Sequence, residues 1–412
     1  MKTILLSQKA ERDNLLANTY LSRNIVLSTA DLLQSKTIKL ITGPRRVGKS
    51  VFALLLLKQQ NFAYLNFDDN QLLTNWNEDL VMLALQQVYP NYKYLLLDEV
   101  QNLPNWDLWV SKLYRQGVNM VITGSNANML SQEMSTVLTG RYIPIEMLPF
   151  SLTETLQWKQ LDSNSKECKN QKTLQVQNYL FYGGYPEIVN NLAIAKSYLS
   201  TLYDSILLKD VAKRHKIRNT DDLYNLAAYL LANFCNSITA NDLCSNLGFK
   251  SVTTVQKFLQ YLHEPYLFFY LPRYNNKLQY MKKAAHKVYV VDNGFVNSAA
   301  FNLSENRGRL LENQVFVELL RRGYNIETTL FYYHSRNDKE VDFVTRQGAK
   351  VEQLIQVCYD LSAGRTRKRE LDSLVECAEE LNCDHLSIVT YSDEQTITYR
   401  SHTINIVPVS KW

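Results

Sequence analysis

The stretch "ITGPRRVGKS" at 41–50 constrains this chain most, because it contains the pattern G-x-x-x-x-G-K-[ST]. Gly43 and Gly48 occupy its glycine positions, and Lys49 and Ser50 complete it. Glycine lets a backbone turn its N–H groups inward around a phosphate. In such a loop the lysine reaches the terminal phosphates and the hydroxyl ligates Mg²⁺. The pattern therefore predicts a site for ATP with Mg²⁺.

The flanking residues support this reading. "TIKLIT" before the loop alternates like a strand, and "SVFALLLLKQQ" after it reads as a helix whose N-terminus faces the phosphates. A solvated basic turn is the alternative, and this context disfavours it. We predict an α/β fold with a P-loop parallel sheet, and nucleotide contacts from Gly43, Pro44, Arg45, Arg46, Val47, Gly48, Lys49, Ser50 and Val51.

A second apolar run, "YKYLLLDEVQN" at 92–102, ends in Asp98 and Glu99. Such a run is typical of a buried parallel strand, and ligands bind beyond the carboxyl ends of such strands. We expect Asp98 to hold Mg²⁺ together with Ser50, and Glu99 to polarise the attacking water. Two exposed acids at the end of a strand would be the ordinary alternative without the loop.

Three further strand patterns complete the expected sheet. "GVNMVITGSNAN" at 117–128 ends in small polar residues, of which Ser125 and Asn126 could bond the γ-phosphate or the water. Asn126 is the candidate sensor. Arg141 stands before the strand in "LTGRYIPIEMLPF" at 138–150, and it is either a finger for a neighbouring subunit's nucleotide or an ordinary surface arginine.

The remaining strand is "FAYLNFDD" at 62–69, which ends in Asp68 and Asp69. These acids either contact the groups that hold the metal ion, without binding it themselves, or cap the helix that follows.

These motifs, in this order, resemble an AAA-type ATPase family that is often fused to a C-terminal nuclease-like domain. The resemblance covers nearly the whole chain and continues in "FYGGYPEIV", "VYVVDNGFVN", "GRLLENQVFVELLRRG", "KEVDF" and "LIQVCYDL". It implies an AAA+ fold, a helical or winged-helix middle and a restriction-endonuclease-like end. We predict domains at 1–160, 174–290 and 291–412, with the polar stretch 162–172 as a linker.

The middle reads as three short helices at 220–234, 239–248 and 251–264, followed by a strand at 266–275. The second helix has a capping signal at its start and a glycine at its end. This order suggests a winged helix whose third helix would read DNA. Because few basic residues lie on or beside that helix, a module between domains is the favoured alternative.

The C-terminal pattern of helix, hairpin, strand, helix and strand resembles the core of PD-(D/E)xK nucleases. Those enzymes need an acid on the helix, an Asp after the hairpin and an E-x-K on the next strand. Glu312 and Asp342 fill the first two places, but the third reads Gln356-Val357-Cys358. We therefore expect no DNA cleavage from this domain, unless Lys339 or Lys350 replaces the missing lysine.

Composition bounds the partners. The formal net charge of +5 permits an anionic partner, and basic clusters at 208–219 and 365–370 could contact phosphate or be solvated helix ends. Six scattered cysteines suggest reduced thiols. We find neither a signal peptide nor an apolar run long enough to span a membrane.

The sequence thus predicts a cytoplasmic Mg²⁺-dependent ATPase, with DNA and further copies of the chain as candidate partners. The alternatives are a nucleotide-gated DNA-binding scaffold with little turnover and an ATP-dependent nuclease.

Overall fold

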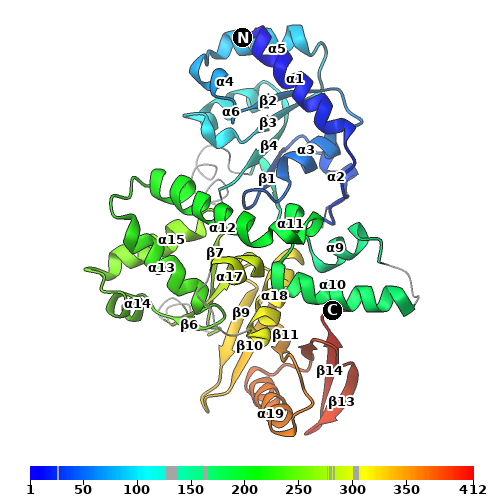
Figure 1. Cartoon of the computed structure of the whole chain (residues 1–412), viewed down its shortest axis with the longest axis vertical. Coiled ribbons are helices and arrows are strands. Elements are labelled where there is room, and N and C mark those ends of the chain that lie inside the picture. Colours follow the sequence, from blue (N-terminus) through cyan, green and yellow to red (C-terminus); the bar gives the residue numbers. More distant parts are fainter. Residues whose placement is uncertain are drawn as a thin grey trace. The chain divides into compact units, whose positions relative to one another are not determined.

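The computed structural model describes the chain except for residues 26, 127–137, 139, 162–165, 276, 278–280, 282–283 and 300–305; within the helix that begins at Lys166, side chains are described from residue 170 onward. The described residues form two compact units. Unit 1 comprises 1–148 and 264–266, and unit 2 comprises 149–263 and 267–412. Figure 1 draws most of unit 1 in blue to cyan and most of unit 2 in green to red.

Unit 1 contains a five-stranded, fully parallel sheet in the order β2-β3-β4-β1-β5. Because the strands are parallel, their carboxyl ends lie at one edge, where residues distant in sequence meet. The strands are β1 (Ile38–Thr42), β2 (Phe62–Asn66), β3 (Tyr94–Asp98), β4 (Asn119–Gly124) and β5 (Tyr142–Glu146).

Helices connect these strands and cover the sheet (Figure 1). The first helix packs on β2, where the buried amide of Gln8 donates to Asn66 O at 3.1 Å and accepts from Asn66 N at 3.0 Å. The helices are α1 (Lys2–Ala17), α2 (Thr29–Gln34), α3 (Lys49–Leu57), α4 (Asn70–Thr74), α5 (Glu78–Val88), the 3₁₀ turn η1 (Val100–Asn102) and α6 (Trp106–Arg115).

Unit 2 begins with helices: α9 (Leu152–Trp158), α10 (Lys166–Tyr182), α11 (Pro186–Asn190), the turn η2 (Leu192–Ile194), α12 (Ala195–Ser205) and a π-helix η3 (Ile206–Lys213). The sequence interpretation of 162–172 as a linker was wrong for 166–172, which lie in α10. Lysine, glutamate and glutamine are good helix formers, so a polar stretch is not by itself a loop signal.

A small antiparallel sheet, β6-β8-β7, follows with its helices. Thr239 caps the helix that follows β6 by accepting from Asp242 N at 3.1 Å, as the sequence predicts. The elements are α13 (Thr220–Ala232), β6 (Ser237–Ile238), α14 (Ala240–Asn246), α15 (Val252–His263), β7 (Phe268–Pro272), β8 (His286–Val290) and α17 (Asn293–Ala299).

A six-stranded mixed sheet in the order β13-β14-β12-β11-β10-β9 completes unit 2. The expected hairpin is β9 with β10, and α19 packs on β10 and β11 over a hydrophobic cluster. The elements are α18 (Arg307–Arg321), β9 (Leu330–His334), β10 (Glu340–Gln347), β11 (Lys350–Val357), α19 (Gly364–Leu381), β12 (Leu386–Thr390), β13 (Gln395–Tyr399) and β14 (His402–Pro408).

A buried carboxylate explains two of the quoted motifs of unit 2. Asp292 accepts hydrogen bonds from the N–H groups of Gly184 at 2.7 Å and Gly294 at 2.9 Å. Gly183 has φ +80°, and a Cβ there would lie 1.6 Å from the Asp292 Oδ1 atom. Gly183 is therefore required by the close approach of this carboxylate, whereas a Cβ at Gly184 would lie 2.1 Å from the carbonyl oxygen of Phe150. Burial raises the pKa of Asp292 to about 6 although both hydrogen bonds lower it.

We expect Asp292 to make the stability of unit 2 pH-dependent. The folded chain keeps this proton up to about pH 6, whereas the unfolded chain releases it near the ordinary value of 3.8, so folding binds a proton between these values. The free energy of unfolding of the wild type, relative to Asp292→Asn, should fall by up to roughly 3 kcal/mol from pH 4 to pH 7. Denaturant titrations at several pH values measure this difference.

The exposed Asp384→Asn serves as the matched surface control. A difference between wild type and Asp292→Asn that does not change with pH would contradict the argument.

Candidate nucleotide-binding site

The loop between β1 and α3 has the backbone that its glycines permit. Gly43 has φ +143°, and a Cβ there would lie 2.0 Å from the carbonyl oxygen of Met147. Gly48 has φ +92° and directly precedes α3, whose first residue is Lys49. No other residue type fits at position 43, because its neighbour is backbone and cannot move aside.

Lys49 points back into the loop. Its side chain is buried, and its ammonium donates to the carbonyl oxygen of Pro44 at 3.0 Å. The same ammonium lies 3.6 Å from the Oε1 atom of Glu99. The loop lysine and the acid after β3 therefore form an ion pair.

Asp98 is the centre of the hydrogen bonds at this sheet edge. Its Oδ1 atom accepts from Ser50 Oγ at 2.8 Å and from Thr123 Oγ1 at 2.5 Å, and its Oδ2 atom accepts from Tyr64 Oη at 3.1 Å. The carboxyl group joins α3, β4 and β2 through three hydroxyl groups. Burial raises the pKa of Asp98 to about 6, and the hydrogen bonds from Thr123, Ser50 and Tyr64 oppose that rise.

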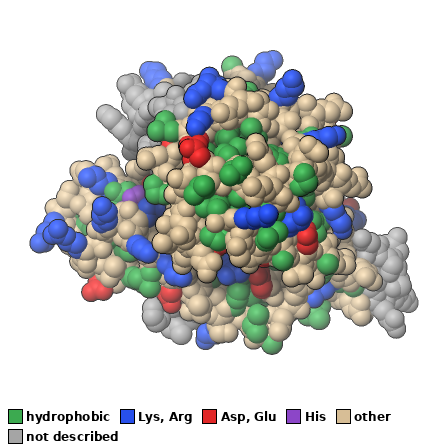
Figure 2. All heavy atoms as spheres, turned by 90° about the horizontal axis from the view of Figure 1, so that it is seen from above, with side chains coloured by type: hydrophobic (Ala, Val, Ile, Leu, Met, Phe, Trp, Pro, Cys, Tyr) green, Lys and Arg blue, Asp and Glu red, His purple; other side chains and the backbone are tan. Residues whose placement is uncertain are grey.

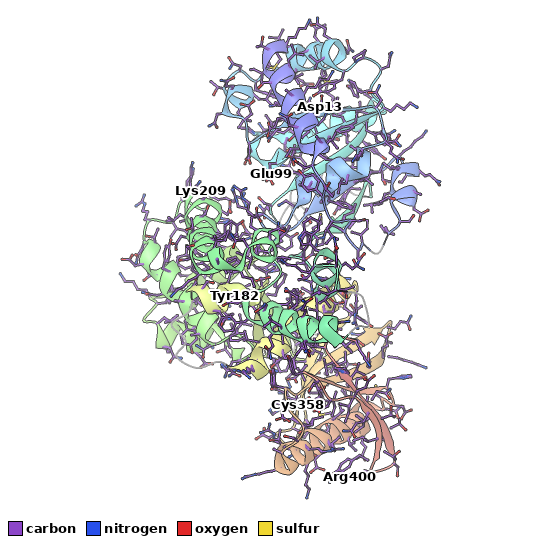
Figure 3. The ribbon with its side chains drawn as sticks, turned by 45° about the vertical axis from the view of Figure 1, so that its right-hand side comes forward. Asp13, Glu99, Tyr182, Lys209, Cys358 and Arg400 are labelled. Carbon is purple, nitrogen blue, oxygen red and sulfur yellow. The ribbon has the colours of Figure 1, made fainter. Side chains whose placement is uncertain are left out.

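Glu99, labelled in Figure 3, follows Asp98. Its backbone is left-handed, at φ 53° and ψ 44°. Its N–H donates to Thr123 Oγ1 at 2.9 Å, and the amide of Gln101 donates to its Oε2 atom at 2.5 Å. Burial acts to raise the pKa of Glu99, but Lys49 and Gln101 outweigh it, so the pKa is lowered. Glu99 is therefore an ionised carboxylate held by two partners.

The residues present fit a magnesium ion. Mg²⁺ prefers hard oxygen ligands and is commonly held by one or two protein groups together with phosphate oxygens. The Ser50 hydroxyl and the Asp98 carboxylate are adjacent oxygen donors beside the phosphate-binding loop. Among the described residues, no group of three or more His, Cys, Asp or Glu side chains is arranged to hold a metal ion.

Comparison with known proteins agrees with this geometry. Residues 35–156 match a family described as AAA domain, and 173–307 and 307–412 match two families described as domains of unknown function. An uncharacterized protein of Methanocaldococcus jannaschii is 34% identical over 396 residues, which cover 91% of this chain and 88% of that protein. This chain belongs to the same family as that uncharacterized protein, and its residues 35–156 belong to the AAA domain family. An uncharacterized Haemophilus influenzae protein is 32% identical over 343 residues, covering 79% of this chain and 83% of its own length.

Solved structures resemble this chain more distantly. The Walker-type ATPase of Pyrococcus abyssi has a TM-score of 0.42 at 14% identity and covers 69% of this chain and 99% of its own. Cdc6p of Pyrobaculum aerophilum has a TM-score of 0.27 at 16% identity, and the match covers 64% of this chain and 92% of Cdc6p. The AAA assignment therefore depends on the family match over residues 35–156.

The other predicted residues of the AAA sheet lie in different surroundings. Asn126 and Ser125 are buried directly after β4, and residues 127–128 of that stretch lie outside the described residues. Asp69 caps α4 by accepting from Gln71 N at 2.8 Å, which favours the capping interpretation. Asp68 is exposed and accepts from the side chain of Asn102 at 2.7 Å.

Arg141 lies at the opposite edge of the sheet from Asp98. It directly precedes β5, which runs parallel to β1, and its guanidinium carbon lies 5.6 Å from the ring centroid of Tyr114. A strand of five residues separates it from the edge that carries the loop, which is roughly 16 Å. That span exceeds the length of an arginine side chain, so Arg141 does not reach the loop of its own chain.

Three site residues were missed from the sequence: Tyr64, Thr123 and Gln101. Tyr64 and Thr123 lie inside strands, where they read as ordinary core positions. The sequence does contain a signal for Thr123, because it is a polar residue next to the apolar run of β4. The preceding strand, β3, ends at Asp98 and is followed by Glu99, so a hydroxyl near the end of β4 could meet these acids. Gln101 sits in a turn that the strand pattern does not describe.

The nuclease-like residues of unit 2 come together only in part. Glu312 and Asp342 both contact the ammonium of Lys287, on β8, at 2.9 Å. Cys358 instead packs in the hydrophobic cluster under α19, and burial raises the pKa of its thiol to about 11. The lysine whose ammonium contacts both acids is Lys287, 25 residues before Glu312, whereas the sequence suggested Lys339 or Lys350.

The distribution of charge on the surface does not distinguish DNA from other candidate partners. On the face drawn in Figure 2, Lys and Arg side chains lie scattered among hydrophobic and acidic ones. In the described part of the chain, no helix is long and apolar enough to cross a membrane.

Thr123 should be the main support of the paired acids. Thr123→Val keeps the shape but removes the donor to Asp98 and the acceptor of the Glu99 N–H group. Leaving buried polar groups unpaired costs about 1–3 kcal/mol, so the free energy of unfolding of unit 1 should fall by that amount. The exposed Thr74→Val is the control in the same unit, and equal unfolding midpoints for both variants would refute this role.

Proposed function

We propose that this chain binds Mg²⁺-ATP and hydrolyses it by attack of water on the γ-phosphate. The proposal rests on one observation. Lys49 and Ser50 after β1 meet Asp98 and Glu99 after β3 through direct contacts at 2.8 and 3.6 Å. A loop lysine, a hydroxyl and two acids in this arrangement match the parts of P-loop ATP hydrolysis.

The loop residues Gly43 to Val51 would surround the phosphates with backbone N–H groups at the start of α3. Ser50 and Asp98 would hold Mg²⁺, which neutralises charge on the phosphate oxygens. Asp98 must lose its proton for this role, and with its pKa at about 6 it is mostly ionised at neutral pH.

Glu99 would orient water and accept its proton. In the structure its carboxylate pairs with Lys49. When the lysine turns to the terminal phosphates, that pairing weakens and the carboxylate remains held by Gln101 beside Ser125. Binding of ATP would in this way free the Glu99 carboxylate from Lys49, so that it can accept a proton from the attacking water. Asn126, next to Ser125, would sense the γ-phosphate.

Arg141 would serve a neighbouring copy of the chain. It lies at the sheet edge opposite the loop and cannot reach the nucleotide of its own chain, so a finger at this position would have to act in trans. This role makes a homo-oligomer the active form.

Unit 2 would supply the contact with a partner. We propose that α13, β6, α14, α15, β7 and β8 form a winged helix and that α18, β9, β10, β11, α19 and β12 form a restriction-endonuclease-like core, because their order along the chain matches those folds. The proposed domains are 1–160, 174–290 and 291–412, and residues 149–160 of the first of them lie in unit 2. DNA is the candidate partner, and the proposed location of the protein is the cytoplasm. The alternative function is a nucleotide-gated DNA-binding scaffold with little turnover of ATP.

The test separates binding from chemistry. Lys49→Ala should weaken ATP binding at least tenfold, about 1.4 kcal/mol, because it removes the charge that faces the phosphates. Glu99→Gln should keep ATP bound while turnover falls about a hundredfold or more. Calorimetry and phosphate release, each with and without duplex DNA, measure the two effects.

The controls are Lys58→Ala at the end of α3 and Asp79→Asn on α5, both exposed in unit 1. Unchanged ATP affinity in Lys49→Ala would refute the binding site. Tight ATP binding by the wild type with negligible turnover, with or without DNA, would favour the scaffold.

Complementation tests the trans role of Arg141. Arg141→Ala keeps an intact loop and Lys49→Ala keeps an intact arginine, so each alone should lose turnover. Co-expressed as mixed oligomers, the two should recover part of it, because one chain's arginine completes the other's site. When Lys49→Ala is co-expressed with the double variant Lys49→Ala/Arg141→Ala, no turnover should be recovered, because neither chain has an intact loop. Wild-type turnover in Arg141→Ala alone would rule out the finger.

A further inference from the structure

Three carboxylates of unit 2 surround one lysine. The ammonium of Lys287 lies 2.9 Å from Glu312 Oε1, 2.7 Å from Glu340 Oε1 and 2.9 Å from Asp342 Oδ1. Its side chain is only 4% exposed, whereas that of Glu340 is 38% exposed. Glu312 comes from α18, the other two acids come from β10, and Lys287 comes from β8. Three separate elements therefore meet at this ion-pair cluster.

The carboxylate oxygens that face Lys287 accept hydrogen bonds from protein groups. An ammonium has three donors, and here three carboxylates accept them. Asp342 Oδ2 accepts from Val357 N at 2.9 Å, and Glu312 Oε1 also accepts from Tyr289 Oη at 2.8 Å. Gln356, at the place of the third nuclease acid, accepts from Asp342 N at 3.4 Å and donates to Glu370 at 2.8 Å. The oxygen atoms that would share a metal ion are thus turned toward protein donors.

The lysine is also held in place by its strand. It lies on β8, the central strand of the small sheet, paired with Ser237 and Leu271. Asn313 of α18, next to Glu312, accepts from Val290 N at 2.8 Å and donates to Val290 O at 2.9 Å. The backbone of β8 is therefore fixed to the helix that carries one of the acids, which keeps the origin of the Lys287 side chain beside the cluster.

We propose that the Lys287 ammonium is a built-in substitute for the divalent cation of this acidic site. Glu312 and Asp342 lie largely out of solvent, with the more exposed Glu340 beside them, and such a group of acids needs a positive charge because unpaired buried charges are strongly unfavourable. In nuclease-like folds that charge is a metal ion; here it is covalently attached to the chain. The native site consequently takes no metal, and it becomes a metal site when the lysine side chain loses its charge.

The test uses the full chain without nucleotide and Mn²⁺ as the probe. Lys287→Met keeps the length of the side chain but removes its charge. We expect it to bind one more Mn²⁺ per chain than the wild type, counted by the paramagnetic resonance of free Mn²⁺, and to regain thermal stability as Mn²⁺ is added. In Lys287→Met with Asp342→Asn the additional ion should be lost; ions at the P-loop affect all variants equally.

A second variant covers failure of the first to fold. Lys287→Met with Glu340→Gln leaves two acids with less repulsion, and it too should gain one Mn²⁺. The proposal is overturned if neither variant gains an ion. It is also overturned if the wild type binds a Mn²⁺ that Asp342→Asn alone removes, or if the wild type cuts DNA with Mg²⁺ or Mn²⁺ and Asp342→Asn does not. Those results would make Lys287 the nuclease lysine beside a bound metal.

Discussion

The structure of the candidate site depends on one buried carboxylate at the end of β3. Asp98 accepts from hydroxyl groups of α3, β4 and β2, so its position sets that of the loop helix and both neighbouring strands. Placing one acid among three donors orients it without an external ion. Because Thr123 bonds both Asp98 and the backbone of Glu99, the same contacts determine where the next carboxylate points.

Much of unit 1 could be predicted from the sequence, because its signals are local. The loop pattern, the apolar strands and the acids after β3 each lie within about a dozen consecutive residues, and parallel strands bring their ends to one edge. Tyr64 and Gln101 could not be found this way. Their roles depend on which neighbour a side chain meets across the sheet or around a turn, and no periodicity records that.

Unit 2 shows the opposite case. Glu312 and Asp342 were placed by their order along the chain, but the cation between them comes from β8, outside the nuclease-like pattern. A lysine inside an apolar strand such as "HKVYV" is ambiguous, since it is either an edge residue or the partner of a buried acid. Only the pairing of β8 with its neighbours and the contact of Asn313 decide between these readings. Cys358 stands where the nuclease pattern expects a lysine, and its side chain belongs to the hydrophobic core.

The left-handed backbone of Glu99 has a consequence for how this chain could change over time. A side chain with a Cβ in that conformation costs roughly 1–2 kcal/mol that glycine would not. Glycine at position 99 would relieve this strain, but it would leave the buried ammonium of Lys49 without its carboxylate partner. Among relatives that have lost nucleotide turnover but kept the fold, we therefore expect positions 49 and 99 to change together, while the sheet around them remains unchanged.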